Sequence, residues 1–176
     1  LMRTGLVGDS ELTEEWRVYA DTQWVELLLT INWRERRRLL KLTLPTPQGG
    51  DSRLDGVMGG LLERPNSGRE CPLQDWSLLP VGSEKLALAS PSLFAIDATP
   101  WRVRSTLLRS PVITQHDPAQ QVLARAVYAD HGIHHFRIAF AAGTGMAAEK
   151  LRLKALSMHR QPLAADLTNG MPRMKA

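Results

Sequence analysis

The sequence predicts an all-β protein, an antiparallel β-sandwich with one helix near its C-terminal end. Three observations support this prediction. Apolar and polar residues alternate with a period of two in several segments, as expected for half-buried strands. Long polar loops separate these segments, and helical apolar spacing occurs clearly only in one late segment. Many strands with one helix are typical of two packed antiparallel sheets, not of enzyme folds in which helices alternate with strands.

The segment 22–33 (TQWVELLLTINW) has the strongest strand pattern, with one wholly apolar face and one mixed face. The segment 39–44 (LLKLTL) repeats the alternation, and Pro45 ends it because proline cannot donate a hydrogen bond to a neighbouring strand. Residues 46–55 are rich in turn-forming residues, and 56–65 (GVMGGLLERP) is predicted to form one further strand. The residues expected to point inward are Val25, Leu27, Leu29, Ile31, Trp33, Leu40, Leu42 and Leu44.

Three more strands are predicted after a long polar loop at 65–75. They lie in 85–90 (KLALAS), 93–97 (LFAID) and 101–109 (WRVRSTLLR). In the last segment Trp101 begins an alternation with arginines, which places its side chain on the inner face. The tryptophans expected in the core are Trp24, Trp33 and Trp101.

A strand at 134–140 (HHFRIAF) and a helix at about 146–159 complete the prediction. Residues 121–129 fit either a strand or a helix. The helix has one apolar face with steps of three and four residues, which indicates that it packs on a sheet. The residues of that face are Ala148, Leu151, Ala155 and Met158.

The length of 176 residues is suited to one domain, which we expect to span residues 1–176. Cys71 is the only cysteine, which excludes an internal disulfide and a cysteine-based zinc cage. The first residues lack the apolar region of a signal peptide, although the chain could begin inside a longer protein. These features predict a cytoplasmic location, and a secreted protein without disulfides would also fit them.

The charge pattern predicts neither a nucleic-acid partner nor a membrane partner. The formal net charge is only +4, from 22 basic and 18 acidic residues. The one dense basic run, residues 34–38 (RERRR), contains a glutamate and follows a predicted strand, so we interpret it as a solvated turn. No apolar run approaches the ~20 residues of a membrane-spanning helix.

Three histidines and an aspartate lie close together in the segment 128–136 (YADHGIHHF). Imidazole and carboxylate groups are ligands of zinc, nickel and iron. However, His134 shares a strand face with Phe136 while His135 points to the other side, so the imidazole groups diverge. We therefore interpret them as structural or interface histidines and predict no metal site in this chain.

Several acidic residues are present, but no motif selects a catalytic pair. Glycoside hydrolases use two carboxyl groups that flank the scissile bond. The carboxylates considered for such a pair are Glu63, Asp75, Asp97 and Asp130. Nothing in their spacing favours two of them, so the residues alone indicate a β-sandwich without a visible activity.

Four motifs, in order along the chain, carry more information. They are NWRERRRLLKL (32–42), GGLLERP (59–65) with the following CPLQDW (71–76), TLLRSP (106–111) and DHGIHHF (130–136). Together they resemble the C-terminal β-sandwich region of glycoside hydrolase family 38, the retaining α-mannosidases, over roughly residues 15–165. Asn32 replaces an aspartate of the family pattern. The segment 140–145 (FAAGTG) lacks a histidine that family members often have after the fourth motif.

The resemblance implies a supporting domain without catalytic residues of its own. In the family, the zinc ion and the aspartate nucleophile belong to an N-terminal α/β domain. Neither the alternation of strands and helices nor the histidine-x-aspartate motif of that domain occurs in this chain. The resemblance further implies that the first strands of the sandwich are missing, that the chain holds no cofactor, and that it is inactive alone. Its expected partners are the catalytic domain and an α-mannoside.

The residues expected to contact substrate or the catalytic domain lie in the second and fourth motifs. They are Glu63, Arg64, Asp130, His131 and His134. Arg64 ends a predicted strand, where a fixed guanidinium group could bind sugar hydroxyls or a partner carboxylate, or form an ordinary salt bridge. Two alternative functions stay open: a stand-alone carbohydrate-binding or interaction module, and a small metal-dependent enzyme built on the histidines.

Overall fold

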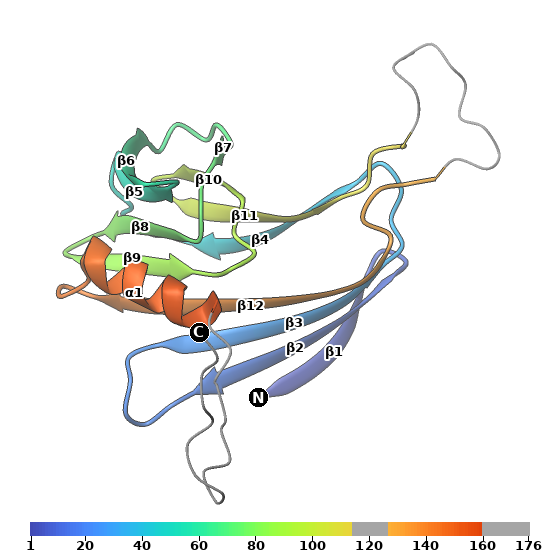
Figure 1. Ribbon diagram of the computed structural model, residues 1–176, viewed down its shortest axis with the longest axis horizontal. Coiled ribbons are helices and arrows are strands. Elements are labelled where there is room, and N and C mark those ends of the chain that lie inside the picture. The colour runs from blue at the N-terminus through green and yellow to red at the C-terminus, as the bar shows by residue number, and fades with distance from the viewer. Residues whose placement is uncertain (114–126, 160–176) are drawn as a thin grey trace, which may run out of the picture.

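The structure is a computed structural model that describes residues 1–113 and 127–159 (Figure 1). Of the segment 121–129, whose secondary structure the sequence left ambiguous, residues 121–126 lie outside the described residues. The strands are β1 (Met2–Val7), β2 (Ser10–Val18), β3 (Val25–Trp33), β4 (Leu39–Pro45), β5 (Ser52–Val57), β6 (Gly60–Pro65), β7 (Cys71–Pro72), β8 (Trp76–Val81), β9 (Glu84–Ala89), β10 (Ala95–Thr99), β11 (Arg102–Arg109) and β12 (Gly132–Gly143), and the helix is α1 (Ala148–His159).

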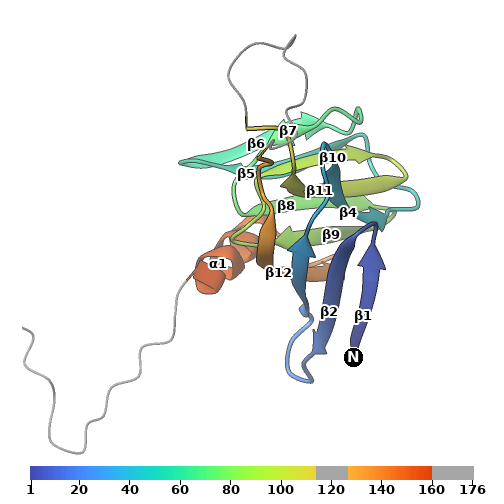
Figure 2. The same cartoon turned by 90° about the vertical axis from the view of Figure 1, so that its right-hand side faces the viewer.

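These strands form two antiparallel sheets, which confirms the predicted sandwich. The larger sheet has eight strands in the order β1-β2-β3-β12-β9-β8-β5-β6, and the smaller has four in the order β4-β11-β10-β7. β12, the last of the described strands, pairs with β3 on one side and β9 on the other. Figure 2 shows β1 and β6 at the two free edges of the larger sheet.

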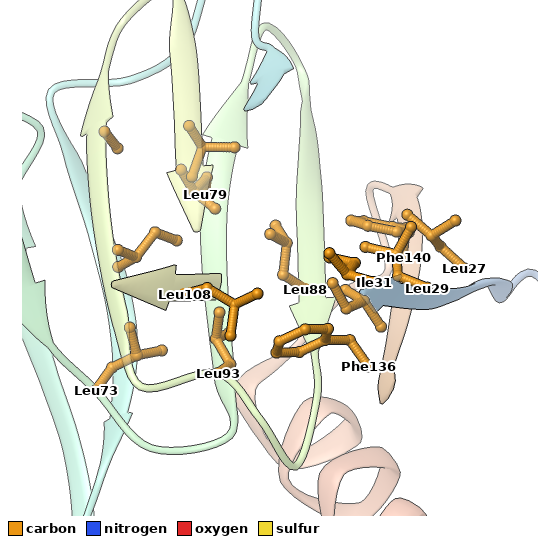
Figure 3. Close-up of a cluster of buried hydrophobic side chains, with 14 of the residues drawn as sticks. Leu27, Leu29, Ile31, Leu73, Leu79, Leu88, Leu93, Leu108, Phe136 and Phe140 are labelled. Atoms are coloured by element: carbon orange, nitrogen blue, oxygen red, sulfur yellow. The ribbon is translucent and has the colours of Figure 1, made fainter. Parts of the chain in front are cut away.

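The main core lies between the two sheets, and Figure 3 shows its side chains meeting in one cluster. The alternation predicted for β3 is confirmed, because its odd-numbered side chains from Leu27 to Trp33 are buried against this core. Leu40, Leu42 and Leu44 of β4 pack partly buried against the same cluster. Burial of each such side chain stabilises the fold by about 1.5–3 kcal/mol.

Helix α1 covers part of the outer face of the larger sheet, and its predicted apolar face is confirmed. Leu151, Ala155 and Met158 are buried against Trp76 and a row of alanines in β9 and β12. Lys154 of α1 also donates to the carboxylate of Glu26 in β3, at 2.8 Å. Within the described residues, no helix is long and apolar enough to cross a membrane.

The segment 56–65 does not form the single strand that the sequence predicted. It contains the end of β5, a tight turn and the whole of β6, which pair as a hairpin. Gly59 has a φ of 78° in the turn, a conformation that glycine adopts without steric strain. The expected turn-rich region therefore ends earlier, at Ser52, where β5 begins.

The prediction that Trp101 lies in the core is wrong. Trp101 is 70% exposed, because β11 begins one residue later, at Arg102, and the tryptophan lies in the connection from β10. Trp33 is buried, as expected, and Trp24 packs partly buried beneath α1. Further along β11, a register shift between Thr106 and Leu108 brings Leu108 into the core.

Candidate functional site

The five residues predicted to form a site fall into two separate groups. Glu63 and Arg64 lie in the edge strand β6, whereas Asp130 and His131 lie in the turn before β12 and His134 lies near the beginning of that strand. Three strands separate β6 from β12, so the groups are about 19 Å apart along the sheet at ~4.8 Å per strand. Figure 1 shows the two segments at opposite ends of the molecule, and the structure does not bring the five residues together.

The end that carries Asp130 and His131 is dominated by residues 34–38, which connect β3 to β4 and which we call the arginine turn. Its four arginines are exposed, as the sequence predicted, and Arg109 at the end of β11 lies beside them and is also exposed. Arg37 has a φ of 54°, an uncommon conformation for a residue with a side chain. Tertiary contacts must therefore hold this turn in place.

Ser110 provides part of that support. It is fully buried, and its backbone accepts a hydrogen bond from the Arg37 amide at 2.8 Å and donates one to the Arg38 carbonyl at 2.9 Å. Its hydroxyl accepts a hydrogen bond from the Arg38 amide and donates one to the Arg38 carbonyl, both at 3.1 Å. Ser110 thus fixes the backbone of the arginine turn through both its side chain and its own backbone.

Glu35 anchors the same turn from the other side, and its burial corrects the interpretation of this run as simply solvated. Its carboxylate accepts hydrogen bonds from the Asp9 amide at 2.6 Å and the Ser10 hydroxyl at 3.3 Å. Glu35 as a whole is only 8% exposed. A Cβ on Gly8 would lie 2.3 Å from Glu35 Oε1 and the φ of Gly8 is 65°, so a larger residue there would be strained and would displace the Glu35 carboxylate. The connection between β1 and β2 therefore holds the arginine turn against the sandwich.

Two of the predicted site residues support this end of the molecule, Asp130 at the end of β11 and His131 at the arginine turn. Asp130 accepts a hydrogen bond from the Arg109 amide at 2.9 Å. The His131 imidazole donates through Nε2 to the Glu35 carbonyl at 2.8 Å and stacks on Tyr128, with 5.4 Å between ring centroids. The Arg36 guanidinium lies 5.6 Å from the centre of the Tyr128 ring, close enough for a cation–π interaction.

The histidines do not form a metal site within the described residues. His134 donates through Nε2 to the Asp130 carbonyl at 2.8 Å, and His135 hydrogen-bonds through Nδ1 to Thr30 at 3.1 Å in the neighbouring strand. A ring nitrogen that donates to a carbonyl carries a hydrogen and cannot bind a metal. In residues 1–113 and 127–159, no group of three metal-binding side chains lies close enough to hold a metal ion.

Between the arginine turn and the end of β11 lies an open depression of about 490 Å³. Its lining residues are Arg37, Arg38, Leu39, Arg109, Ser110, Pro111 and Val112. Three of these residues are arginines, and apolar atoms form most of the lining surface. Arginine binds carboxylates and other anions through two parallel hydrogen bonds, so this arrangement is suited to an anionic group.

The sequence did not identify Arg37, Arg38, Arg109 and Ser110 as site residues. They come from two segments that lie 72 positions apart in the chain and meet through the pairing of β4 with β11. The sequence did contain a signal that could have identified them, because these residues lie in the first and third family motifs.

The outer face of the smaller sheet carries an ion-pair network that continues to Arg109. Glu70 accepts hydrogen bonds from Lys41 and Thr106, each at 2.6 Å, and pairs with Arg109. Lys41 also pairs with the buried carboxylate of Asp97. Burial raises the pKa of Asp97, but hydrogen bonds and charges from its basic partners outweigh this effect and hold the pKa below its usual value.

At the opposite end, Arg64 belongs to an internal network in the β5–β6 hairpin. Its Nε lies 3.7 Å from Oδ2 of Asp55, which also accepts hydrogen bonds from Arg53 Nε at 3.0 and 3.1 Å. Arg53 and Asp55 have no exposed side-chain surface, and Arg64 retains 17%. Glu63 points to the other face of the hairpin and accepts a hydrogen bond from Ser52 at 2.6 Å.

Comparison with known proteins identifies the family. The sequence model described as the glycosyl hydrolases family 38 C-terminal domain matches residues 3–118, so the chain belongs to this family, and the predicted resemblance to the family is confirmed. The match includes β1, β2 and the first three motifs and ends before the fourth motif. No curated protein matches the chain.

Two solved structures have a similar fold. One is an alpha-mannosidase from Enterococcus faecalis V583, with a TM-score of 0.68 and 13% sequence identity. The other is a protein in the glycosyl hydrolase family 38 from Enterococcus faecalis, with a TM-score of 0.68 and 14% identity. Each similarity covers 84% of this chain and 18% of the other, so this chain spans less than a fifth of the length of these proteins.

Proposed function

We propose that the chain is a non-catalytic supporting domain of an α-mannosidase-like glycoside hydrolase, which packs on the catalytic domain and contributes to the wall of the sugar site. The observation that carries the proposal is the match to the C-terminal domain family, together with a fold shared with 18% of an alpha-mannosidase chain. The catalytic domain is the expected partner, an α-mannoside the expected substrate, and zinc a cofactor of the catalytic domain.

The positions of Glu63 and Asp130 support a non-catalytic role. Retaining glycosidases need two carboxyl groups about 5–5.5 Å apart, and inverting enzymes about 6.5–9.5 Å. Glu63 lies in β6 and Asp130 lies in the turn before β12, and these two strands are about 19 Å apart along the sheet. Asp130 is also occupied by the Arg109 amide. These two residues therefore cannot act together on one glycosidic bond.

The supporting role is tested by comparing this chain with the complete polypeptide encoded by its gene. We expect no hydrolysis of an aryl α-mannoside by the purified chain, with or without added zinc, and hydrolysis by the complete polypeptide. Arg64→Ala in the complete polypeptide should weaken catalysis or domain assembly. Turnover by the isolated chain, lost on Glu63→Gln or Asp130→Asn, would place the chemistry in this domain and refute the proposal.

One observation favours a second function, a carbohydrate-binding module. Trp101 presents an indole ring that is 70% exposed, and such rings stack on sugar rings. Titration of the chain with manno-oligosaccharides should then show binding that Trp101→Ala removes. Phe94, which is 65% exposed, provides a matched control, since Phe94→Ala should leave the binding unchanged. Equal loss in both variants would argue against a specific site at Trp101.

A further inference from the structure

The depression beside the arginine turn has more positive charge than its own acidic residues neutralise. Glu35 is turned inward and binds the connection between β1 and β2, and its contact with Arg38 is long, 3.5 Å, and leaves that arginine 72% exposed. Arg109 is 55% exposed and shares Glu70 with Lys41. Arg37 forms no ion pair within residues 1–113 and 127–159. Within the described part of the chain, positive charge of these arginines is therefore left without an acidic partner.

The same depression also exposes apolar side chains. Leu39 is 46% exposed, Pro111 is exposed and Val112 is partly buried. Ile113, directly beyond the depression, is 63% exposed. Aliphatic side chains next to arginines are typical of protein–protein interfaces, in which arginine is enriched. A small inorganic anion would leave these apolar side chains uncovered.

The backbone of the site is already held in one conformation. Ser110 fixes Arg37 and Arg38 through hydrogen bonds of 2.8–3.1 Å, and Glu35 fixes the turn from the opposite side. Asp130 holds the amide of Arg109. Groups that are positioned before binding lose less conformational entropy when a partner arrives. The uncommon φ of Arg37, 54°, is maintained by this support.

We propose that this depression is a docking site for an acidic segment of the catalytic domain, whose Asp or Glu carboxylates pair with Arg37 and Arg38 while an adjacent apolar side chain covers Leu39 and Val112. The proposal rests on the proposed function, because it names the surface of this domain that the catalytic domain contacts. It also gives a shared purpose to Asp130 and His131, which support the end of β11 and the arginine turn and do not themselves contact the partner.

Hydrogen–deuterium exchange on the complete polypeptide and on this chain alone tests the proposal. We expect amides of residues 34–40 and 109–113 to exchange more slowly in the complete polypeptide. Arg37→Glu combined with Arg38→Glu should lower that protection roughly 10- to 100-fold, since hydrogen bonds to charged groups are lost. Arg152→Glu on α1, where the side chain is 54% exposed, is the matched control and should leave protection unchanged.

A second variant excludes misfolding as the cause. Arg37→Gly removes one guanidinium group and suits the left-handed backbone, so it should reduce protection without lowering the unfolding midpoint. Protection confined to other surfaces of this domain, or unaffected by the Arg37 and Arg38 variants, would refute the docking site and leave the proposed function intact. Equal exchange everywhere on this chain in both proteins would refute the proposed function, and the docking site with it.

Discussion

The Arg53–Asp55 pair provides the most direct test of how the hairpin β5–β6 is stabilised. Asp55 has no exposed side-chain surface and accepts hydrogen bonds from Arg53 and from the Ser77 hydroxyl, the latter at 2.7 Å. Asp55→Ala would leave the Arg53 guanidinium buried with only neutral acceptors, Pro65 O and Asn66 Oδ1, both at 3.2 Å. Removing one partner of a buried ion pair typically destabilises a protein by about 3–5 kcal/mol.

This loss is large compared with the total stability of a domain, about 5–15 kcal/mol. With a denaturant slope of about 2–3 kcal/mol per molar urea, the unfolding midpoint of Asp55→Ala should fall by roughly 1–2 M. The measurement is urea unfolding of the isolated chain, followed by tryptophan fluorescence. Asp51→Ala changes an exposed aspartate next to the same hairpin and should move the midpoint very little.

A double variant separates the cost of an unpaired charge from the loss of packing. Arg53→Met combined with Asp55→Leu removes both charges, and replacement of a buried pair by apolar residues is often neutral or stabilising. The double variant should therefore recover most of the midpoint that Asp55→Ala loses. If Asp55→Ala lowers the free energy of unfolding by less than about 1 kcal/mol, the assumed cost of an uncompensated buried arginine is wrong for this site.

Two further outcomes are expected from the structure. Trp33→Ala should lower the free energy of unfolding by about 3–5 kcal/mol, because Trp33 is 2% exposed in the core, whereas Trp101→Ala should change it by less than about 0.5 kcal/mol; equal effects would contradict the assignment of core and surface. The pKa of Asp97 is lowered in the folded state, so its contribution to stability is complete above the unfolded pKa and is lost as the pH falls through the folded pKa. Asp97→Asn should therefore reduce the acid sensitivity of unfolding below about pH 4, as measured by urea midpoints across pH, and an unchanged pH dependence would argue against this network.

Local sequence patterns determined the elements that present a regular apolar face. β3 alternates because successive side chains of a strand point to opposite faces, and α1 has steps of three and four because of helical geometry. Both periods are properties of the backbone of one segment, so the sequence alone was enough to predict them. The strands β2 and β8 lack this signal, since β2 is polar on much of both faces and β8 is buried at four successive residues.

The candidate site could not be predicted in the same way. Whether Glu35 is buried, and whether Ser110 meets Arg38, depends on the pairing of β4 with β11 and on the approach of the β1–β2 connection. Trp101 shows the same limit, because β11 begins only at Arg102 and the tryptophan therefore lies in the connection before the strand, where it is exposed. Contacts between distant segments are set by strand order and register, which arise from the packing of the whole sandwich and leave no periodic signal in any one segment.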